Sequence, residues 1–236
     1  DESTTQILPP YLNNQSYLVA TPWGEPLATS PTVPAEDNMM RLATTGTLRT
    51  DGTVAARTTC RFEGINDNAY RGFFSRLDPD QRRNVFERLL SQAVPGAIMT
   101  AFSLEPEDMQ DVSVPLMAEF SFSSGNLLVP VGNTALFSPP VFGQRIGMIR
   151  YLIDKTDLEA RRFPLYTHVT CGSDETLDIA LAPGAGPFVS VPDPIFSHDH
   201  GILRAANATL ADGALRSHRV FVLERTEYSP EDYGYL

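Results

Sequence analysis

The side chains of this chain that could perform covalent chemistry are two cysteines, and neither has the neighbours of a nucleophile. Cys60 lies in an alternating run beside Thr58 and Phe62, an apolar row that raises the pKa of a thiol. Cys171 follows His168 by three residues, and an odd spacing on a strand puts two side chains on opposite faces. The pattern therefore predicts two buried structural cysteines and no local cysteine–histidine pair.

These two cysteines leave two redox states open. They are the only cysteines in the chain, so it can hold one disulfide or two free thiols. Both positions are expected on inward faces of strands, which makes a disulfide between Cys60 and Cys171 an open alternative. Two thiolates cannot build a zinc site that needs four.

One segment, Ser197-His198-Asp199-His200-Gly201, resembles a metal-ligand cluster. Imidazole and carboxylate groups are good ligands for zinc or nickel. In an extended segment, however, His198 and His200 point one way and Asp199 the other, and no second cluster has matching spacing. A polar loop between strands is the simpler interpretation, and we expect no cofactor. A metal-dependent hydrolase that uses His198 and His200 is kept as an alternative.

The elements that position these residues are predicted mainly by two aspartate-glycine dipeptides. Asp51-Gly52 and Asp212-Gly213 each stand between alternating apolar and polar runs, and such a dipeptide supplies the positive φ of a tight hairpin turn. After the first turn, alternate positions from Val54 to Phe62 are predicted to face inward and the arginines between them to face water. His218 falls within the last hairpin and is expected to be a surface residue or a cross-strand partner.

Two apolar stripes at helical spacing follow the first hairpin. The first repeats at intervals of three and four residues from Tyr70 to Leu77. Asp78-Pro79-Asp80-Gln81 then opens the second, because aspartate caps a helix, proline suits its first position and glutamine completes a capping box. Pro95-Gly96 ends it. The sequence therefore predicts a helical pair over about residues 67–93.

Strand patterns on both sides of this pair predict an α+β fold that is mostly antiparallel β, with β-sandwich-like sheets and the helical pair as an insertion. Residues 132–162 fit either a loop, a helix or a strand. Residues 1–40 are rich in proline and are expected to form an extended lead-in across the domain surface. Residues 41–236 are expected to form the β-rich domain.

The composition excludes some classes of partner. The chain has 236 residues, 18 of them basic and 29 acidic, for a net charge of −11. This balance repels a phosphate backbone and argues against nucleic acid. No apolar stretch reaches the roughly 18 residues that a transmembrane helix requires.

Short stretches that occur in order over nearly the whole chain carry a family resemblance. They are Ala35-Glu36-Asp37-Asn38, Thr50-Asp51-Gly52, the helix from Asp78 through Leu90 with its Val94-Pro95-Gly96 exit, Arg161-Arg162-Phe163-Pro164-Leu165, Val191-Pro192-Asp193-Pro194, Gly213-Ala214-Leu215 and Tyr228-Ser229-Pro230-Glu231-Asp232-Tyr233. In this order they resemble the β-rich region of unknown function that follows the catalytic core in bacterial transglutaminase-like cell-envelope proteins, whose core has a cysteine-protease fold.

The resemblance implies a non-catalytic accessory domain in the periplasm or at the cell surface of a bacterium. Its partners would be the upstream catalytic domain of the same polypeptide and a peptide or envelope ligand. The family's Cys and His motifs are missing here, and Asp1 resembles a remnant of the segment that carries the family's catalytic Asp. An aspartate alone only orients a histidine, so the isolated chain is expected to be inactive. A stand-alone glycan- or protein-binding β module is the alternative.

Overall fold

The computed structural model describes residues 12–154, 156 and 158–236. Its elements follow one another as β1 (Ser16–Tyr17), β2 (Ala28–Thr29), η2 (Ala35–Asn38), β3 (Met39–Leu48), β4 (Val54–Phe62), α1 (Ile65–Phe74), α2 (Pro79–Ala93), β5 (Ile98–Glu105), β6 (Met117–Ser124), β7 (Leu128–Val131), β8 (Thr134–Phe137), α3 (Met148–Ile153), β9 (Leu165–Tyr166), β10 (Cys171–Leu181), β11 (Ile195–Asp199), β12 (Ile202–Ala211), β13 (Ala214–Leu223), β14 (Glu227–Tyr228) and η3 (Asp232–Tyr235).

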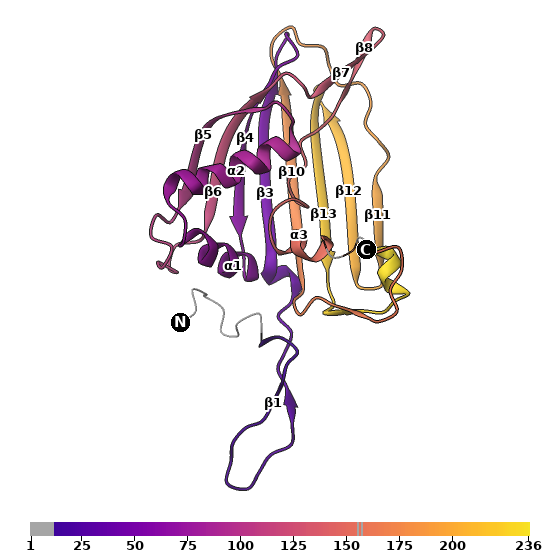
Figure 1. Ribbon diagram of the computed structural model, residues 1–236. Helices are drawn as coiled ribbons and strands as arrows, with labels where there is room; N and C mark the ends of the chain where they lie inside the picture. The colour runs from indigo at the N-terminus through magenta and orange to yellow at the C-terminus, as the bar shows by residue number, and fades with distance from the viewer. Residues whose placement is uncertain (1–11, 155, 157) are drawn as a thin grey trace.

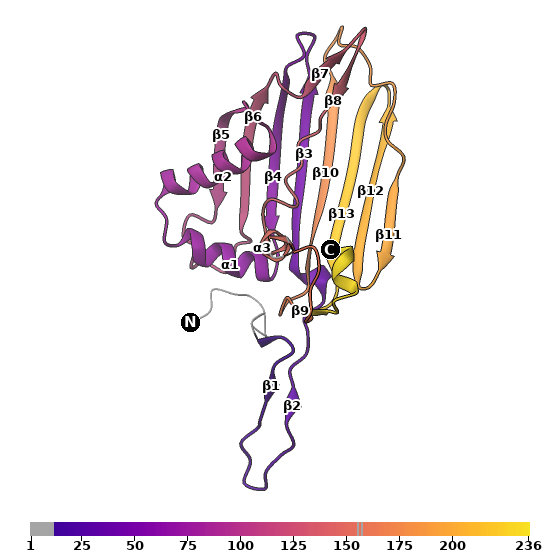
Figure 2. The same cartoon turned by 45° about the vertical axis from the view of Figure 1, so that its right-hand side comes forward.

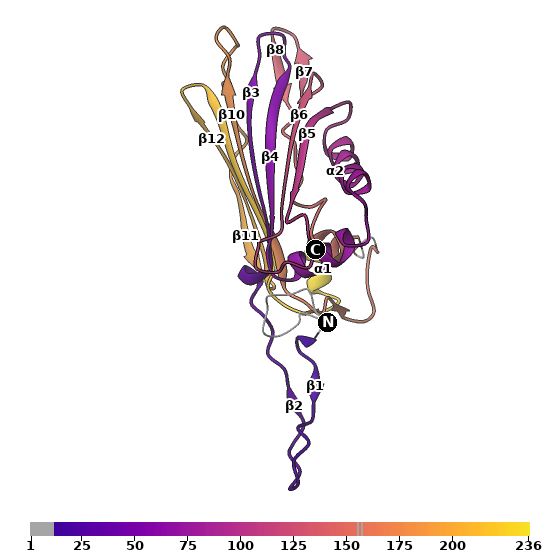
Figure 3. The same ribbon diagram turned by 90° about the vertical axis from the view of Figure 1, so that its left-hand side faces the viewer.

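One large sheet forms the centre of the molecule. Within the described residues its eight strands are ordered β11-β12-β13-β10-β3-β4-β6-β5, and three two-stranded ribbons accompany it. The helices lie on one face of this sheet and leave the other face open (Figures 1 and 3). The α+β class with mostly antiparallel strands is therefore confirmed. The sandwich-like arrangement is wrong, because the layer packed against the large sheet is made of helices and loops.

Both predicted aspartate-glycine hairpins are present, and they turn differently. At the β12–β13 turn, Asp212 and Gly213 both have positive φ, 53° and 78°, as a two-residue turn requires. At the β3–β4 turn only Gly52 does, at 81°. There Asp51 instead accepts a hydrogen bond from the backbone N–H of Thr53 through its side chain, at 2.9 Å.

Two strands that are far apart in the sequence pair at the middle of the sheet. β3 and β10 pair in parallel, with Leu42 opposite Glu175, whereas the other ladders of the sheet are antiparallel. The helices and about half of the chain lie between these two strands in sequence. The parallel pair thus joins an N-terminal half of the sheet, β3-β4-β6-β5, to a C-terminal half, β10-β13-β12-β11.

The predicted helical pair is confirmed as α1 and α2. Asp78 caps α2, its side chain accepts from the backbone N–H of Gln81 at 2.8 Å, and the Gln81 side chain accepts from the backbone N–H of Asp78 at 3.1 Å. A core of aromatic rings lies between the helices and the sheet. In it, the ring centroid of Phe120 is 6.0 Å from that of Phe86 and 5.4 Å from that of Phe142. The ambiguous region 132–162 contains β8 and the short helix α3.

A buried arginine fixes the loop between β5 and β6. The Arg71 side chain on α1 is 1% exposed and pairs with Asp67 one turn earlier, at 2.7 Å. Its guanidinium also donates to the backbone carbonyl oxygens of Asp111 and Val114, at 3.0 and 2.9 Å. The sequence pattern gave no sign of this role, because the carbonyl partners are about 40 residues away in the chain.

Most of the described part of the predicted lead-in does not lie across the domain as expected. Residues 12–34, which we call the arm, project from one end of the sheet as a hairpin built on β1 and β2, in all three views (Figures 1, 2 and 3). β1 and β2 contribute two residues each. The division into residues 1–40 and 41–236 stays a prediction.

Candidate functional site

The two cysteines are buried and unbonded, so the open disulfide is not formed in this structure. Cys60 on β4 and Cys171 at the start of β10 are both free thiols that are 0% exposed. Cys60 lies opposite Leu42 of β3, whereas Cys171 lies beyond β3 near the level of Asn38. Two strand spacings and four residues along a strand separate their Cα atoms by roughly 16 Å, and a disulfide needs less than about 7 Å.

The surroundings of both thiols oppose reactivity. Burial raises the pKa of Cys60 far above its usual range, and the nearby Glu175 carboxyl raises it further. Burial alone raises the pKa of Cys171 to about 12. Because the thiolate is the nucleophile, two thiols held in the protonated form are poor candidates for covalent catalysis.

The structure does not bring the predicted metal-ligand candidates together. His198 Nε2 lies 2.9 Å from a carboxylate oxygen of Glu224, whereas His200 Nδ1 lies 2.5 Å from Asp232. His200 has a φ of 57°, so the segment is not extended there and the expected same-side arrangement of the two imidazoles is wrong. The Asp199 carboxylate accepts instead from the Ser197 hydroxyl, at 3.3 Å. Over residues 12–154, 156 and 158–236 no group of three His, Cys, Asp or Glu side chains is placed to hold a metal ion.

The open face of the sheet carries a network of linked ion pairs that the sequence pattern did not predict. Arg41 contacts Glu63 at 2.8 Å and Asp174 at 3.0 Å. Arg61 extends the chain at Glu63, at 3.1 Å, and His218 extends it at Asp174, at 2.7 Å. His218 is thus a cross-strand partner, as expected. The group is solvent-exposed, and such pairs contribute little stability each.

The arm carries several exposed apolar side chains close together in sequence. Hydrogen bonds join the two sides of the arm at its base. The Ser30 backbone N–H donates to the Gln15 carbonyl at 2.9 Å, and the Ser30 hydroxyl donates to the Leu12 carbonyl. Beyond this base, several large apolar side chains face water. Their exposed fractions are 47% for Tyr17, 64% for Leu18, 45% for Val19, 85% for Trp23 and 69% for Leu27. Sequence reasoning identified the proline-rich segment but not its projection.

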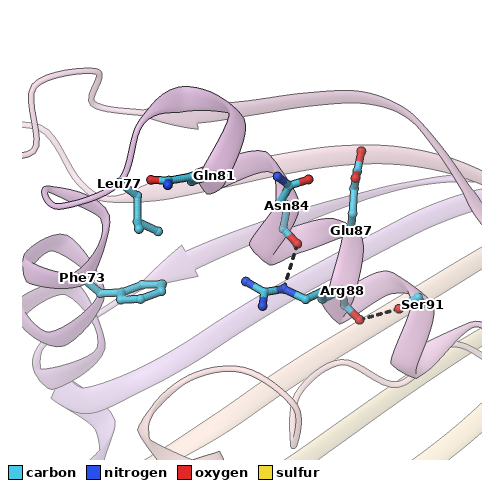
Figure 4. A pocket seen from close by; sticks show the side chains of 7 residues that line it. All are labelled: Phe73, Leu77, Gln81, Asn84, Glu87, Arg88 and Ser91. Atoms are coloured by element: carbon cyan, nitrogen blue, oxygen red, sulfur yellow. Dashed lines mark hydrogen bonds between the residues drawn. The ribbon is translucent and has the colours of Figure 1, made fainter.

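A shallow cleft of about 730 Å³ lies between the end of α1 and one side of α2 (Figure 4). Phe73 and Leu77 form its apolar end, and Figure 4 shows the Arg88 guanidinium directed toward Phe73 from the other side. Arg88 Nε donates to the carbonyl of Asn84 at 3.3 Å. The lining combines Phe73 and Leu77 with polar and charged side chains and contains no cysteine or histidine.

No helix in the described part of the chain is long and apolar enough to span a membrane. Asp1, the suggested remnant of an upstream catalytic segment, lies outside the described residues. Comparisons with protein-family models, with curated proteins and with solved structures each found no match. The site is therefore interpreted from its own geometry.

Proposed function

We propose that this chain is a non-catalytic, protein-binding accessory domain of a bacterial cell-envelope protein, located in the periplasm or at the cell surface. Its partner is the transglutaminase-like catalytic region that the family resemblance puts upstream in the same polypeptide. The arm is the docking element. The observation that carries this proposal is the exposure of the arm's apolar side chains, with Trp23 at 85%.

The energetics of the arm favour a partner. A two-stranded ribbon is at best marginally stable in water, and this one has only two residues in each strand. Clustered exposed apolar residues mark protein interaction sites more often than free surface. Covering Trp23 and Leu27 with a partner would remove apolar area from water, at about 25 cal/mol per Å².

The buried thiols and paired imidazoles support the non-catalytic part of the proposal. Neither sulfur is exposed in a cleft, and the imidazoles of His198, His200 and His218 each face a carboxylate at the protein surface. A cysteine-dependent reaction needs a reachable thiolate beside a base. The chemistry expected of the parent protein would therefore reside in the upstream region.

Copurification tests the docking element. The region encoded upstream of this chain would be produced as a separate polypeptide and mixed with the chain. We expect the two to elute together, and Trp23→Ala to weaken the complex because it removes the most exposed apolar side chain of the arm. Val189→Ala serves as a matched control, since Val189 is 78% exposed but lies in the loop before β11. Equal effects of the two variants, or no complex, would contradict the proposal.

Thiol labelling tests the absence of a cysteine nucleophile. In the native chain we expect both cysteines to react with an aromatic disulfide reagent at the rate of protein unfolding, and at the rate of free cysteine once denaturant is added. A native thiol that reacts quickly at neutral pH would refute the non-catalytic assignment. A glycan array and a peptide panel with the isolated chain would identify a stand-alone binding module instead.

A further inference from the structure

The two edges of the eight-stranded sheet are unlike. At one edge, the pairing of β5 with β6 is irregular between Met99 and Ala101, and such irregularities discourage further strand pairing. At the other edge, all five residues of β11 are exposed, with Ile195 at 63% and Phe196 at 74%. In the described chain no strand pairs with the outer side of β11 (Figures 1 and 2). β11 is therefore a regular, partly apolar and unpaired edge.

The turn between β11 and β12 determines which backbone groups face outward. His200 and Gly201 form this turn with φ values of 57° and 73°, and Asp199 lies opposite Ile202 at its base. Such a turn is closed by a residue pair that exchanges N–H···O bonds, and bonded and unbonded pairs alternate along the strands from there. The alternation directs the N–H and C=O groups of Ser197 toward β12. It directs those of residues 196 and 198 away from the sheet.

This pattern is self-complementary about Ser197. A second β11, antiparallel to the first and centred on the same residue, brings Phe196 of each copy opposite His198 of the other. Outward N–H groups then meet outward C=O groups in both pairs. The Asp199 carboxylates do not face each other, because each lies opposite Ile195 of the other copy, so like charges are kept apart.

We infer that two copies of this chain associate through β11, which joins their large sheets into one continuous sheet around a twofold axis. Pro192 and Pro194 lie just before β11, and proline has no N–H to donate to a ladder. They limit the contact to the five residues of β11. Because the contact is twofold and closes on itself, association stops at the dimer.

Sedimentation velocity of the full chain, from micromolar to near-millimolar concentration, tests this proposal. We expect a reversible dimer. Phe196→Ala and Phe196→Pro remove the same ring, but only proline also removes the outward N–H. The proline variant should weaken the dimer roughly thirtyfold more than the alanine variant, because two backbone hydrogen bonds are lost in each dimer.

Amide hydrogen exchange on the unmodified chain gives a second readout that needs no variant. The N–H groups of Phe196 and His198 should exchange more slowly as concentration rises, and that of Ser197 should be protected at all concentrations. Three results would overturn the proposal. They are a chain that stays monomeric, equal dimer affinity of the two Phe196 variants, or exchange rates of the amides of residues 196 and 198 that do not change with protein concentration. A dimer that is lost with Trp23→Ala and kept with Phe196→Pro would assign self-association to the arm instead.

Discussion

The two halves of the large sheet differ in what covers them. In the N-terminal half, every second residue of β4 and β6 is buried, and α1 and α2 lie over this half of the sheet (Figure 2). In the C-terminal half, β12 has one buried residue, Ile202, and β11 has none. Burial is low at both edges of the sheet, since β5 has no buried residue either, and it is high on β10 near the middle. The halves therefore differ mainly in the helical layer that α1 and α2 add to the first.

The largest expected effect is at the buried arginine of the covered half. Arg71→Met should lower the free energy of unfolding by about 3–5 kcal/mol, because it leaves the Asp67 carboxylate and several carbonyl groups without their guanidinium partner in a largely buried site. Denaturant unfolding measures the loss. Arg83→Met is the control, since Arg83 forms an exposed pair with Glu87 at 2.8 Å and should cost less than about 1 kcal/mol. Similar losses of unfolding free energy for both variants would show that Arg71 stabilises the fold no more than an exposed ion pair does.

Truncating one apolar side chain in each half compares the helix-covered face of the sheet with its open face. Phe120 is 0% exposed and sits among other aromatic rings, so Phe120→Ala should cost about 3–5 kcal/mol. Val220 lies half-buried on the open face of β13, and Val220→Ala should cost about 1 kcal/mol or less. The same unfolding experiment applies. If the two losses were equal, Val220 on the open face would be packed as tightly as Phe120 under the helices.

Glu175, on β10 between the halves, predicts a pH dependence. Burial raises the pKa of this carboxyl, although the backbone N–H groups of Phe142 and Gly143 donate to it. The folded state then holds a proton that the unfolded state has released, so stability falls as pH rises from the ordinary value of 4.5 through the folded pKa. The loss is about 1.4 kcal/mol for each unit between the two values.

A comparison of wild type with Glu175→Gln across this pH range isolates the effect. The variant should show a flatter pH profile of the free energy of unfolding, because glutamine does not titrate. Glu119→Gln, an exposed change on the open face, should leave the wild-type slope in place. A parallel profile for wild type and Glu175→Gln would show that this carboxyl does not titrate differently on folding.

Local patterns predicted local structure well. The Asp78 capping box, the alternation along β4 and both aspartate-glycine turns depend on residues within a few positions of one another, and all are present. The parallel pairing of β3 with β10 could not be predicted from local sequence patterns, since more than 130 residues separate Arg41 from its partner Asp174. Without that pairing, the strand patterns suggested two facing sheets rather than one large sheet.

The candidate site was harder to predict than the fold. The thiols were correctly expected to be buried, because an apolar row on a strand is a local signal. The positive φ of His200 was missed, and it separates this imidazole from His198. The exposure of Trp23 and Leu27 depends on where the arm lies in space, and periodicity carries no information about that position.

The emission of Trp23 tests the central claim most directly, because it is the only tryptophan in the chain and is 85% exposed on the arm. In this chain alone we predict long-wavelength emission that a neutral quencher suppresses efficiently. In a protein extended to include the upstream region, we predict a shift to shorter wavelength and protection from the quencher. Identical emission and quenching in the two proteins would contradict the account of the arm as a docking element.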